Sequence, residues 1–320
     1  MSNYTRVSDR IEELIIDNPN TKPSLKWVNI INAGKNEIGY LRRNYNFDLV
    51  HLKMAAASVS FQRPMIFNGS GYLCLVLHFP VLKEGKIIAG EIDFFVGHGF
   101  LITVHNNSLS PLINLFTLGK KSPDSFLSYS LESSAILLYE ILGNLIDSIY
   151  QLLDENSVKI NNIDDLIFAN RQEEAVKLIL LLLSNIINIR RIMQSHKNIL
   201  QKLMEMNSTL VKRTEIKKYY NSLLDHSQRI WEILDNQKEM IEVLNNTNES
   251  LLNDRMTKIM KTLTIFSVVV FPLTLLAAIF GMNAINMPMV NHPYGFWMII
   301  AIMLTGTLSM VLFFKKKGWI

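Results

Sequence analysis

Cysteine is almost absent from this chain of 320 residues, and the single cysteine, Cys74, lies in an apolar run. One thiol cannot form an intrachain disulfide, so the composition excludes a small fold held together by disulfides. We expect Cys74 to be a buried, small hydrophobic residue. The first 20 residues are polar and charged and lack the apolar core of a cleavable signal peptide. Any insertion into a membrane must then be directed by apolar segments further along the chain.

The sequence patterns of common enzymes and of nucleic-acid-binding proteins are also missing. The chain has no glycine-rich loop that would cradle a phosphate, no pair of catalytic acids and no metal-ligand spacing. The adjacent acids Asp164-Asp165 and Glu173-Glu174 are most simply solvated residues of helices and loops. The formal net charge of +4 is small for this length and does not indicate nucleic acid. We predict that the chain is not an enzyme and has no nucleic-acid partner.

Two long apolar segments stand near the C-terminus, at residues 259–280 and 296–314. Each has about the length needed to cross a hydrocarbon core of ~30 Å, which takes ~20 apolar residues. A buried hairpin of a soluble protein would not normally be apolar on all faces for so long. The segments therefore predict two transmembrane helices.

The distribution of charge around these segments predicts their orientation. Lys258 and Lys261 border the first segment, and Lys315, Lys316 and Lys317 follow the second, whereas residues 281–295 between them include no Lys, Arg, Asp or Glu. Cytoplasmic flanks of membrane helices carry the excess of Lys and Arg. We expect a multi-pass protein of the cell membrane, with both termini in the cytoplasm and the connecting loop outside.

The N-terminal part, residues 1–122, has the pattern of a mixed α/β domain. Apolar runs bounded by turn residues predict strands at residues 25–31 and 72–79, the second closed by Pro80. A hairpin is predicted from residues 87–96 and 100–105, with Gly97-His98-Gly99 as its turn. Residues 36–57 have the pattern of one helix. We expect an α+β cytoplasmic domain.

Strand signals disappear after residue 122, and helical patterns follow. Long helices are predicted at residues 125–155 and 171–206, and the apolar run 178–183 is expected in the core of a helix bundle. No proline interrupts the chain from Glu215 to Pro272, and apolar residues recur there at helical spacings. One helix over residues 215–280 would be about 98 Å long at ~1.5 Å per residue. Several copies side by side would form a funnel leading into a pore, as in an α-helical membrane channel.

These patterns divide the chain into six parts. The α/β domain at residues 1–122 is followed by the helical bundle and funnel helix at 123–256. The first transmembrane helix covers 257–280, the outer loop 281–295, the second transmembrane helix 296–314 and the basic cytoplasmic tail 315–320.

The first transmembrane segment combines apolar residues with the hydroxyls of Thr262, Thr264, Ser267 and Thr274. Two interpretations stay open: the hydroxyls bond back to carbonyls of their own helix, or they face water in a pore. Helical spacing puts six residues on one face, which alternates apolar and polar positions: Met260, Leu263, Ser267, Phe271, Thr274 and Ala278. Apolar rings gate a channel by dewetting, and polar rings replace part of an ion's hydration.

The tripeptide Gly281-Met282-Asn283 stands where the first segment meets the outside. By itself it is a weak signal, because Gly is an ordinary residue just past a helix. A ring of backbone carbonyls and Asn amide oxygens from several subunits would nevertheless suit the water shell of a small hard cation. Mg²⁺ loses its water reluctantly and is usually bound with several waters retained. The membrane segments offer no carboxylate, thiolate or imidazole cluster for a dehydrated ion.

Motifs near the C-terminus match those of a known family: Met260-Lys261-Thr262-Leu263-Thr264, Pro272-Leu273-Thr274, Ile279-Phe280-Gly281-Met282-Asn283, Met287-Pro288, Tyr294-Gly295 and Lys315-Lys316-Lys317-Gly318-Trp319-Ile320. Together with the two C-terminal apolar segments, they make the chain resemble the CorA family of divalent-cation channels. Weaker similarity at residues 94–105 and 220–225 extends the resemblance over the whole chain.

The resemblance implies a homopentamer in the lipid bilayer, with a funnel of long helices and a pore lined by the first transmembrane helix. Gly281, Met282 and Asn283 would form the outer selectivity ring, which binds hydrated Mg²⁺. Five residues would fall at pore-lining or gating positions: Thr257, Met260, Leu263, Phe271 and Thr274. In the family, internal Mg²⁺ bound between cytoplasmic domains holds the channel closed.

The sequence departs from the family pattern at three positions. Phe280 replaces the usual Tyr, Met289 replaces the acid of a common Met-Pro-Glu, and Asn246 stands where relatives with a known regulatory site carry Asp. The first two affect ion preference and uptake rate. The third affects the regulatory site, for which Glu249 and Asp254 are the nearby candidate ligands.

The leading hypothesis is a passive Mg²⁺ uptake channel, with Co²⁺ and Ni²⁺ as further candidate ions. A zinc transporter of the same superfamily is the first alternative, which the intact Gly-Met-Asn disfavours. The second is a membrane-anchored coiled-coil scaffold, which the hydroxyl-bearing segment and the oxygen-rich loop disfavour. Without a nucleotide site, the driving force would be the membrane potential, about 4.6 kcal/mol for a divalent ion per 100 mV.

Overall fold

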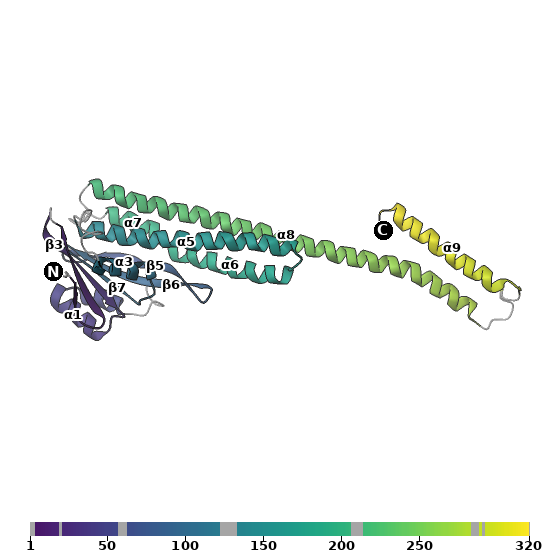
Figure 1. Ribbon diagram of the computed structural model, residues 1–320, viewed down its shortest axis with the longest axis horizontal. Helices are drawn as coiled ribbons and strands as arrows, with labels where there is room; N and C mark the ends of the chain where they lie inside the picture. Colours follow the sequence, from purple (N-terminus) through teal and green to yellow (C-terminus); the bar gives the residue numbers. More distant parts are fainter. Residues whose placement is uncertain are drawn as a thin grey trace. The chain divides into compact units, whose positions relative to one another are not determined.

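The computed structural model describes residues 4–18, 21–56, 63–121, 133–205, 214–282, 288–289 and 292–319 (Figure 1). The chain divides into two compact units, Met1–Leu244 and Asn245–Ile320. Helix α8, Thr214–Phe280, contributes residues to both units. The first unit contains the sheet and the helices packed on it, and the second contains the end of α8 and helix α9, Gly295–Lys316.

A seven-stranded sheet forms the centre of the first unit, in the order β1-β2-β3-β7-β6-β5-β4. Neighbouring strands are antiparallel except β3 and β7, which are parallel. The strands are β1 Tyr4–Arg6, β2 Ile11–Asn18, β3 Thr21–Ile31, β4 Met65–Asn68, β5 Tyr72–Lys83, β6 Lys86–Gly97 and β7 Phe100–His105. The predicted hairpin over Gly97-His98-Gly99 is confirmed as β6–β7. Strands β1 and β2 were not predicted, because their sequence is largely polar.

Helices cover both faces of the sheet, so β5 and β6 are buried along most of their length, except where they meet at the Lys83–Lys86 turn (Figure 1). On one face, Phe47 stacks on Phe95 with ring centroids 4.7 Å apart and contacts Tyr72 at 4.4 Å. On the other face, Trp27 meets Phe116 of α3 (Ser110–Lys121) edge to face at 4.9 Å. The buried aromatic rings fix the helices on the sheet through their large apolar area.

The prediction of a single helix at residues 36–57 is wrong. The structure has two helices there, α1 Lys35–Tyr45 and α2 Leu49–Ala55. Asn46 adopts the left-handed conformation (φ 51°) that ends α1. The Asp48 side chain then accepts a hydrogen bond from the Val50 N–H at 2.8 Å and caps α2. The break allows Phe47, between the two helices, to enter the aromatic core.

The predicted end of a strand at Pro80 is also wrong, because β5 continues to Lys83 and pairs Pro80 with Ala89 of β6. Strand β4 pairs with β5 only as far as Val76. Beyond that residue β5 is an edge strand on this side, and an edge tolerates the missing N–H of a proline.

The long helices differ from their predicted limits. Helix α5 is Ser134–Phe168, so it runs beyond the expected residue 155, and residues 125–132 lie outside the described part. The region predicted as one helix over residues 171–206 contains α6 Gln172–Met193 and α7 His196–Glu205. In the apolar run 178–183, Ile179 and Leu182 are buried as expected, but Leu180 is 62% exposed.

The predicted single helix over residues 215–280 is confirmed by α8. Four of the apolar residues that the spacing put on its packing face are buried: Leu223, Ile230, Leu234 and Ile241. Hydrogen bonds also join α8 to α5, from the Tyr220 hydroxyl to the Ala135 carbonyl at 2.7 Å and from Gln237 Nε2 to the Leu153 carbonyl at 2.7 Å.

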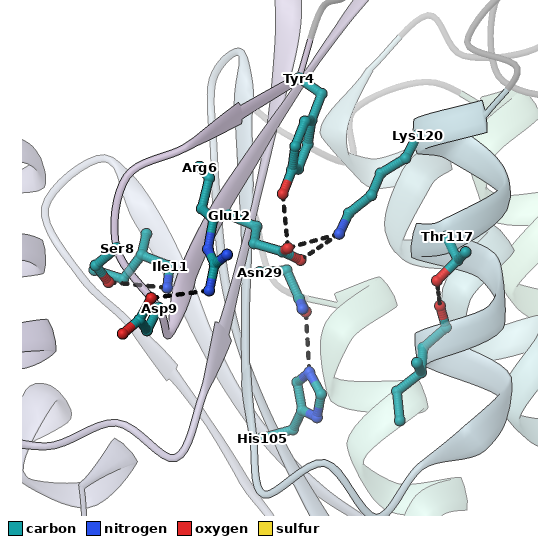
Figure 2. A network of polar contacts seen from close by, with 11 residues as sticks. Tyr4, Arg6, Ser8, Asp9, Ile11, Glu12, Asn29, His105, Thr117 and Lys120 are labelled. Carbon is teal, nitrogen blue, oxygen red and sulfur yellow. Dashed lines mark hydrogen bonds and ion pairs between the residues drawn. The ribbon is translucent and has the colours of Figure 1, made fainter.

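Polar contacts between distant parts of the chain hold α3 to the sheet (Figure 2). Glu12 of β2 accepts hydrogen bonds from Lys120 Nζ at 2.6 and 2.7 Å and from the Tyr4 hydroxyl at 2.8 Å. Burial raises the pKa of Glu12, but the bonds from Lys120 and Tyr4 outweigh it and leave the pKa below its ordinary value. The ion pair is therefore formed at neutral pH.

A second set of buried polar groups lies on β3, β5, β6 and β7. His105 Nε2 bonds to Asn29 Oδ1 at 3.0 Å, and burial lowers the pKa of His105 to about 4 (Figure 2). His78 Nε2 lies 2.9 Å from Glu91 Oε2 across the β5–β6 pair. Asp93, also on β6, is 2% exposed, and its Oδ1 has no hydrogen-bond partner among the described residues. Burial, and then the nearby Glu91, raise the pKa of Asp93 well above its ordinary value.

Asp93 predicts a pH-dependent loss of stability. Because its pKa is raised, Asp93 keeps its proton in the folded protein to higher pH than in the unfolded chain, where it loses the proton above about pH 4. The free energy of unfolding therefore falls as pH rises, by up to ~1.4 kcal/mol per pH unit. Asp93→Asn cannot ionise, and its melting temperature relative to the parent should therefore be several degrees higher at pH 8 than at pH 5, at about 2–4 °C per kcal/mol. Thermal unfolding of the parent and of Asp93→Asn in detergent at both pH values tests this. The histidines contribute equally to both proteins, so their effect cancels in the difference between the two melting temperatures. A difference in melting temperature that does not change with pH would contradict it.

Candidate functional site

Among the residues that the structure describes, three helices are long and apolar enough to cross a membrane by length and composition: Ser134–Phe168, Lys217–Phe280 and Gly295–Lys316. In the most apolar window of the first, α5, 44% of the residues are buried within the structure, against 0% for the other two. The apolar face of α5 is already covered by protein, whereas those of α8 and α9 need lipid or other copies of the chain. The end of α8 and α9 are therefore the membrane helices, as the sequence predicts.

The five predicted pore or gate residues of α8 share one face of the helix. At about 100° per residue, Thr257, Met260, Leu263, Phe271 and Thr274 fall within a sector of about 120°. All five are exposed, and Phe271, Met260 and Leu263 have exposed fractions of 73%, 62% and 61%. Large apolar side chains on such a face require a partner surface or a narrow space that water leaves easily.

The hydroxyls of the first membrane helix bond to carbonyls four residues earlier. Thr264 bonds to Met260, Ser267 to Leu263 and Thr274 to Val270, at 2.8 to 2.9 Å, and Thr262 bonds to Lys258 at 3.0 Å. This confirms the first of the two interpretations of these residues. It leaves the second open, since a hydroxyl that donates its proton still has two lone pairs. The oxygens of Ser267 and Thr274 can therefore accept hydrogen bonds from water on the shared face.

The first two residues of the predicted selectivity motif lie at the C-terminal end of α8. The Gly281 N–H bonds to the Ala277 carbonyl at 2.9 Å, and the Met282 N–H bonds to the Ile279 carbonyl at 3.3 Å. A Cβ at position 281 would come within 3.1 Å of the Ala277 oxygen, closer than most real contacts, so this turn favours glycine. Asn283 lies outside the described residues. The last carbonyls of a helix carry partial negative charge, which favours a cation at this end.

The two candidate regulatory acids point to different sides of α8. Glu249 accepts a hydrogen bond from Asn245 Nδ2 at 3.0 Å, and Asp254 forms an ion pair with Lys258 at 2.7 Å. Five residues along a helix correspond to a rotation of about 140°, so one chain cannot bring both carboxylates to the same ion. Within the described part of the chain, no three His, Cys, Asp or Glu residues are placed to hold a metal.

An acid-lined cavity of about 710 Å³ lies between α5 and α8 in the first unit. Asp164 and Asp165 of α5 and Glu239 of α8 line it together with apolar residues such as Met240. Sequence reasoning treated Asp164 and Asp165 as solvated acids, and they are exposed. It missed their proximity to Glu239, because no sequence pattern connects residues so far apart in the chain.

Sequence comparisons identify relatives along most of the chain. The profile of the family described as CorA-like Mg²⁺ transporter protein matches residues 22–316. The putative metal ion transporter YfjQ of Bacillus subtilis (strain 168) is 25% identical over 293 residues, which cover 92% of this chain and 89% of that protein. The cobalt/magnesium transport protein CorA of Methanocaldococcus jannaschii is 20% identical over 297 residues, which cover 92% of each.

Solved structures share the fold. The complete structure of the CorA magnesium transporter from Methanocaldococcus jannaschii matches with a TM-score of 0.85 at 18% identity, covering 96% of this chain and 98% of that one. The ZntB cytoplasmic domain from Vibrio parahaemolyticus RIMD 2210633 matches with a TM-score of 0.61 at 18% identity, covering 73% of this chain and 90% of that one. At such identities the similarity establishes the fold alone. It confirms the α+β domain, the long helix and the apolar C-terminal helices.

Proposed function

The chain belongs to the family of CorA-like Mg²⁺ transporter proteins, and from this premise we propose that it is a channel for the uptake of hydrated Mg²⁺. One observation carries the proposal. Gly281 and Met282 lie at the carbonyl-bearing end of the long membrane helix, immediately before Asn283 in the sequence. Neutral oxygens at this position suit an ion that keeps its water shell, since Mg²⁺ is reluctant to lose it.

The channel is formed by several copies of the chain, and we propose a homopentamer. In its described part, the second unit of one chain has two membrane helices, and many of their large side chains are exposed, Phe271 and Trp297 among them. Two helices cannot enclose an aqueous path. Several copies that turn the shared face of α8 inward would cover these side chains and form rings of Leu263, Ser267 and Thr274 around one axis.

The membrane potential drives uptake in this proposal. The lysines at the two membrane helices support an orientation with both termini in the cytoplasm and the motif outside. A divalent ion then gains about 4.6 kcal/mol on entering a cell with a potential of 100 mV. Internal Mg²⁺ would close the channel by binding between cytoplasmic parts of neighbouring chains, because Glu249 and Asp254 of one chain cannot share an ion.

Other ions are secondary candidates. The Methanocaldococcus jannaschii relative is a cobalt/magnesium transport protein, which supports Co²⁺ as a further ion, and Ni²⁺ remains an expectation from the sequence. Zinc transport is the alternative within the superfamily, and the similarity to a ZntB cytoplasmic domain is the observation that favours it. That similarity concerns the fold of the cytoplasmic part, so flux measurements with Mg²⁺, Co²⁺, Ni²⁺ and Zn²⁺ in liposomes decide between the ions.

We predict that Asn283→Ala abolishes Mg²⁺ uptake, because the outer ring loses its amide oxygens while the helices stay intact. Liposome flux with a Mg²⁺-sensitive dye measures the effect, and size-exclusion chromatography checks assembly. Asn291→Ala, in the same loop but outside the motif, is the matched control and should transport at about the parental rate. Full Mg²⁺ flux through correctly assembled Asn283→Ala protein would contradict the proposed selectivity ring.

We predict that Leu263→Ser raises the basal leak severalfold at high internal Mg²⁺. A hydroxyl in place of an exposed leucine would keep water in a constriction that otherwise dewets. The same substitution on another face of the helix, Leu273→Ser, is the control and should leave the leak unchanged. If Leu263→Ser leaks no more than the parent, the gate lies elsewhere along α8.

We predict that Asn246→Asp moves closure to lower internal Mg²⁺, by up to about tenfold if the new carboxylate contributes ~1.4 kcal/mol to ion binding. Asn246 is exposed and lies three residues before Glu249 on the same side of α8, so the substitution would put two acids together. Patch recordings at stepped internal Mg²⁺ give the closing midpoint. Asn221→Asp adds the same charge at an exposed position of α8 that lies 28 residues before Glu249, and it serves as the control. An unchanged closing midpoint in Asn246→Asp would assign Mg²⁺ sensing to other acids.

A further inference from the structure

The last turn of α9 ends in a complete Schellman cap. Gly318 adopts the left-handed conformation with φ 68°. The Trp319 N–H bonds to the Phe314 carbonyl at 2.9 Å, and the Gly318 N–H bonds to the Lys315 carbonyl at 3.1 Å. The Trp319 ring stacks on Phe314 with centroids 5.7 Å apart, which is the hydrophobic contact typical of this motif. The basic end of α9 is therefore a folded structure.

A lysine of the other membrane helix holds this cap. Lys261 of α8 donates a hydrogen bond from Nζ to the Gly318 carbonyl at 3.0 Å. The same ammonium group lies 5.9 Å from the centroid of the Trp319 ring. A carbonyl just past a helix end lacks a helical donor, and a cation is favoured at the negative end of the helix dipole. Lys261 satisfies both needs with one group and also gains a cation–π contact.

The rest of α9 offers little that would fix it to α8 within one chain. Gly295 and Phe314 are its only buried residues, and α9 is described over its whole length. Phe314 is 8% exposed and lies under Trp319, inside the cap that Lys261 contacts. The contact between the two helices is therefore concentrated at the end that carries the lysines.

We propose that Lys261 is a positioning residue that fastens the C-terminal cap of α9 to the pore-lining helix of the same chain. The role in gating rests on the proposed function, whereas the fastening itself does not. Lys261 precedes the gate candidate Leu263 by two residues, so a displacement of the α9 cap would be transmitted to the helix turn that contains the constriction. The outer helix thereby restrains the inner one where the channel closes.

The variants Lys261→Met, Lys261→Arg and Lys258→Met of the full chain in detergent or liposomes test this proposal. Methionine keeps most of the aliphatic stem but removes the donor and the charge, whereas arginine keeps both. Lys258→Met is the matched control, because Lys258 lies on the same helix but pairs with Asp254. Hydrogen–deuterium exchange of the peptide that contains the cap amides of residues 317–319 reports whether the cap is held. Mg²⁺ flux at high internal Mg²⁺ reports whether the restraint acts on the gate.

In Lys261→Met, we expect hydrogen–deuterium exchange of the cap amides to be about tenfold faster, which corresponds to a loss of about 1.4 kcal/mol in the free energy of opening the cap. The basal leak of Mg²⁺ should rise about fivefold. Lys261→Arg should restore both, and Lys258→Met should leave cap exchange unchanged. Parental exchange in Lys261→Met overturns the fastening, and faster exchange with an unchanged leak overturns the link to gating. If even the parent carries no Mg²⁺, the proposed function fails, and the exchange data still decide whether Lys261 holds the cap.

Discussion

The internal hydrogen bonding of α8 is the constraint on which the other elements depend. A bilayer offers no partner to a backbone N–H or C=O, so a spanning segment must satisfy these groups within itself. A single helix, Thr214–Phe280, does this in its apolar part, and in the first unit the same geometry lets it pack along α5. Along the helix the side chains change. In the first unit one face is buried against protein, whereas none of the residues in the most apolar part is buried.

This constraint also shapes the polar chemistry of the membrane segment. A helix that keeps nearly all of its carbonyls paired has few oxygens to offer an ion. The exceptions in α8 are its C-terminal end, the side-chain hydroxyls and the carbonyl of Val268, which Pro272 cannot pair because it has no N–H. Ser267 and Thr274 donate to their own helix and keep lone pairs for water. Gly281 comes at the end, where carbonyls are free. Such weak, neutral oxygens suit an ion that exchanges contacts through its hydration shell, and they would be poor ligands for a bare one.

Local sequence patterns were sufficient to predict the longest helix. Residues 215–280 were predicted as one helix because no proline interrupts their helical spacing before Pro272, and the shared face of Met260 and Phe271 follows from the same spacing. Predictions failed where a single residue acts through its surroundings: Asn46 ends α1, and Pro80 is tolerated because β4 stops short of it. The contact of Lys261 with the α9 cap depends on tertiary structure and has no sequence signature. Asn283 stays a prediction.

The burial of Cys74 has a practical consequence. Its side chain is 1% exposed in the sheet core, and burial raises the pKa of its thiol to about 12. The thiolate is the nucleophile that attacks thiol reagents, so the buried, protonated Cys74 of the folded chain reacts with them very slowly. A cysteine introduced on the exposed face of α8 or in the α9 cap would react alone, without any prior replacement of the native residue. The molecule is thus already suited to attaching spectroscopic probes where its movements are to be measured.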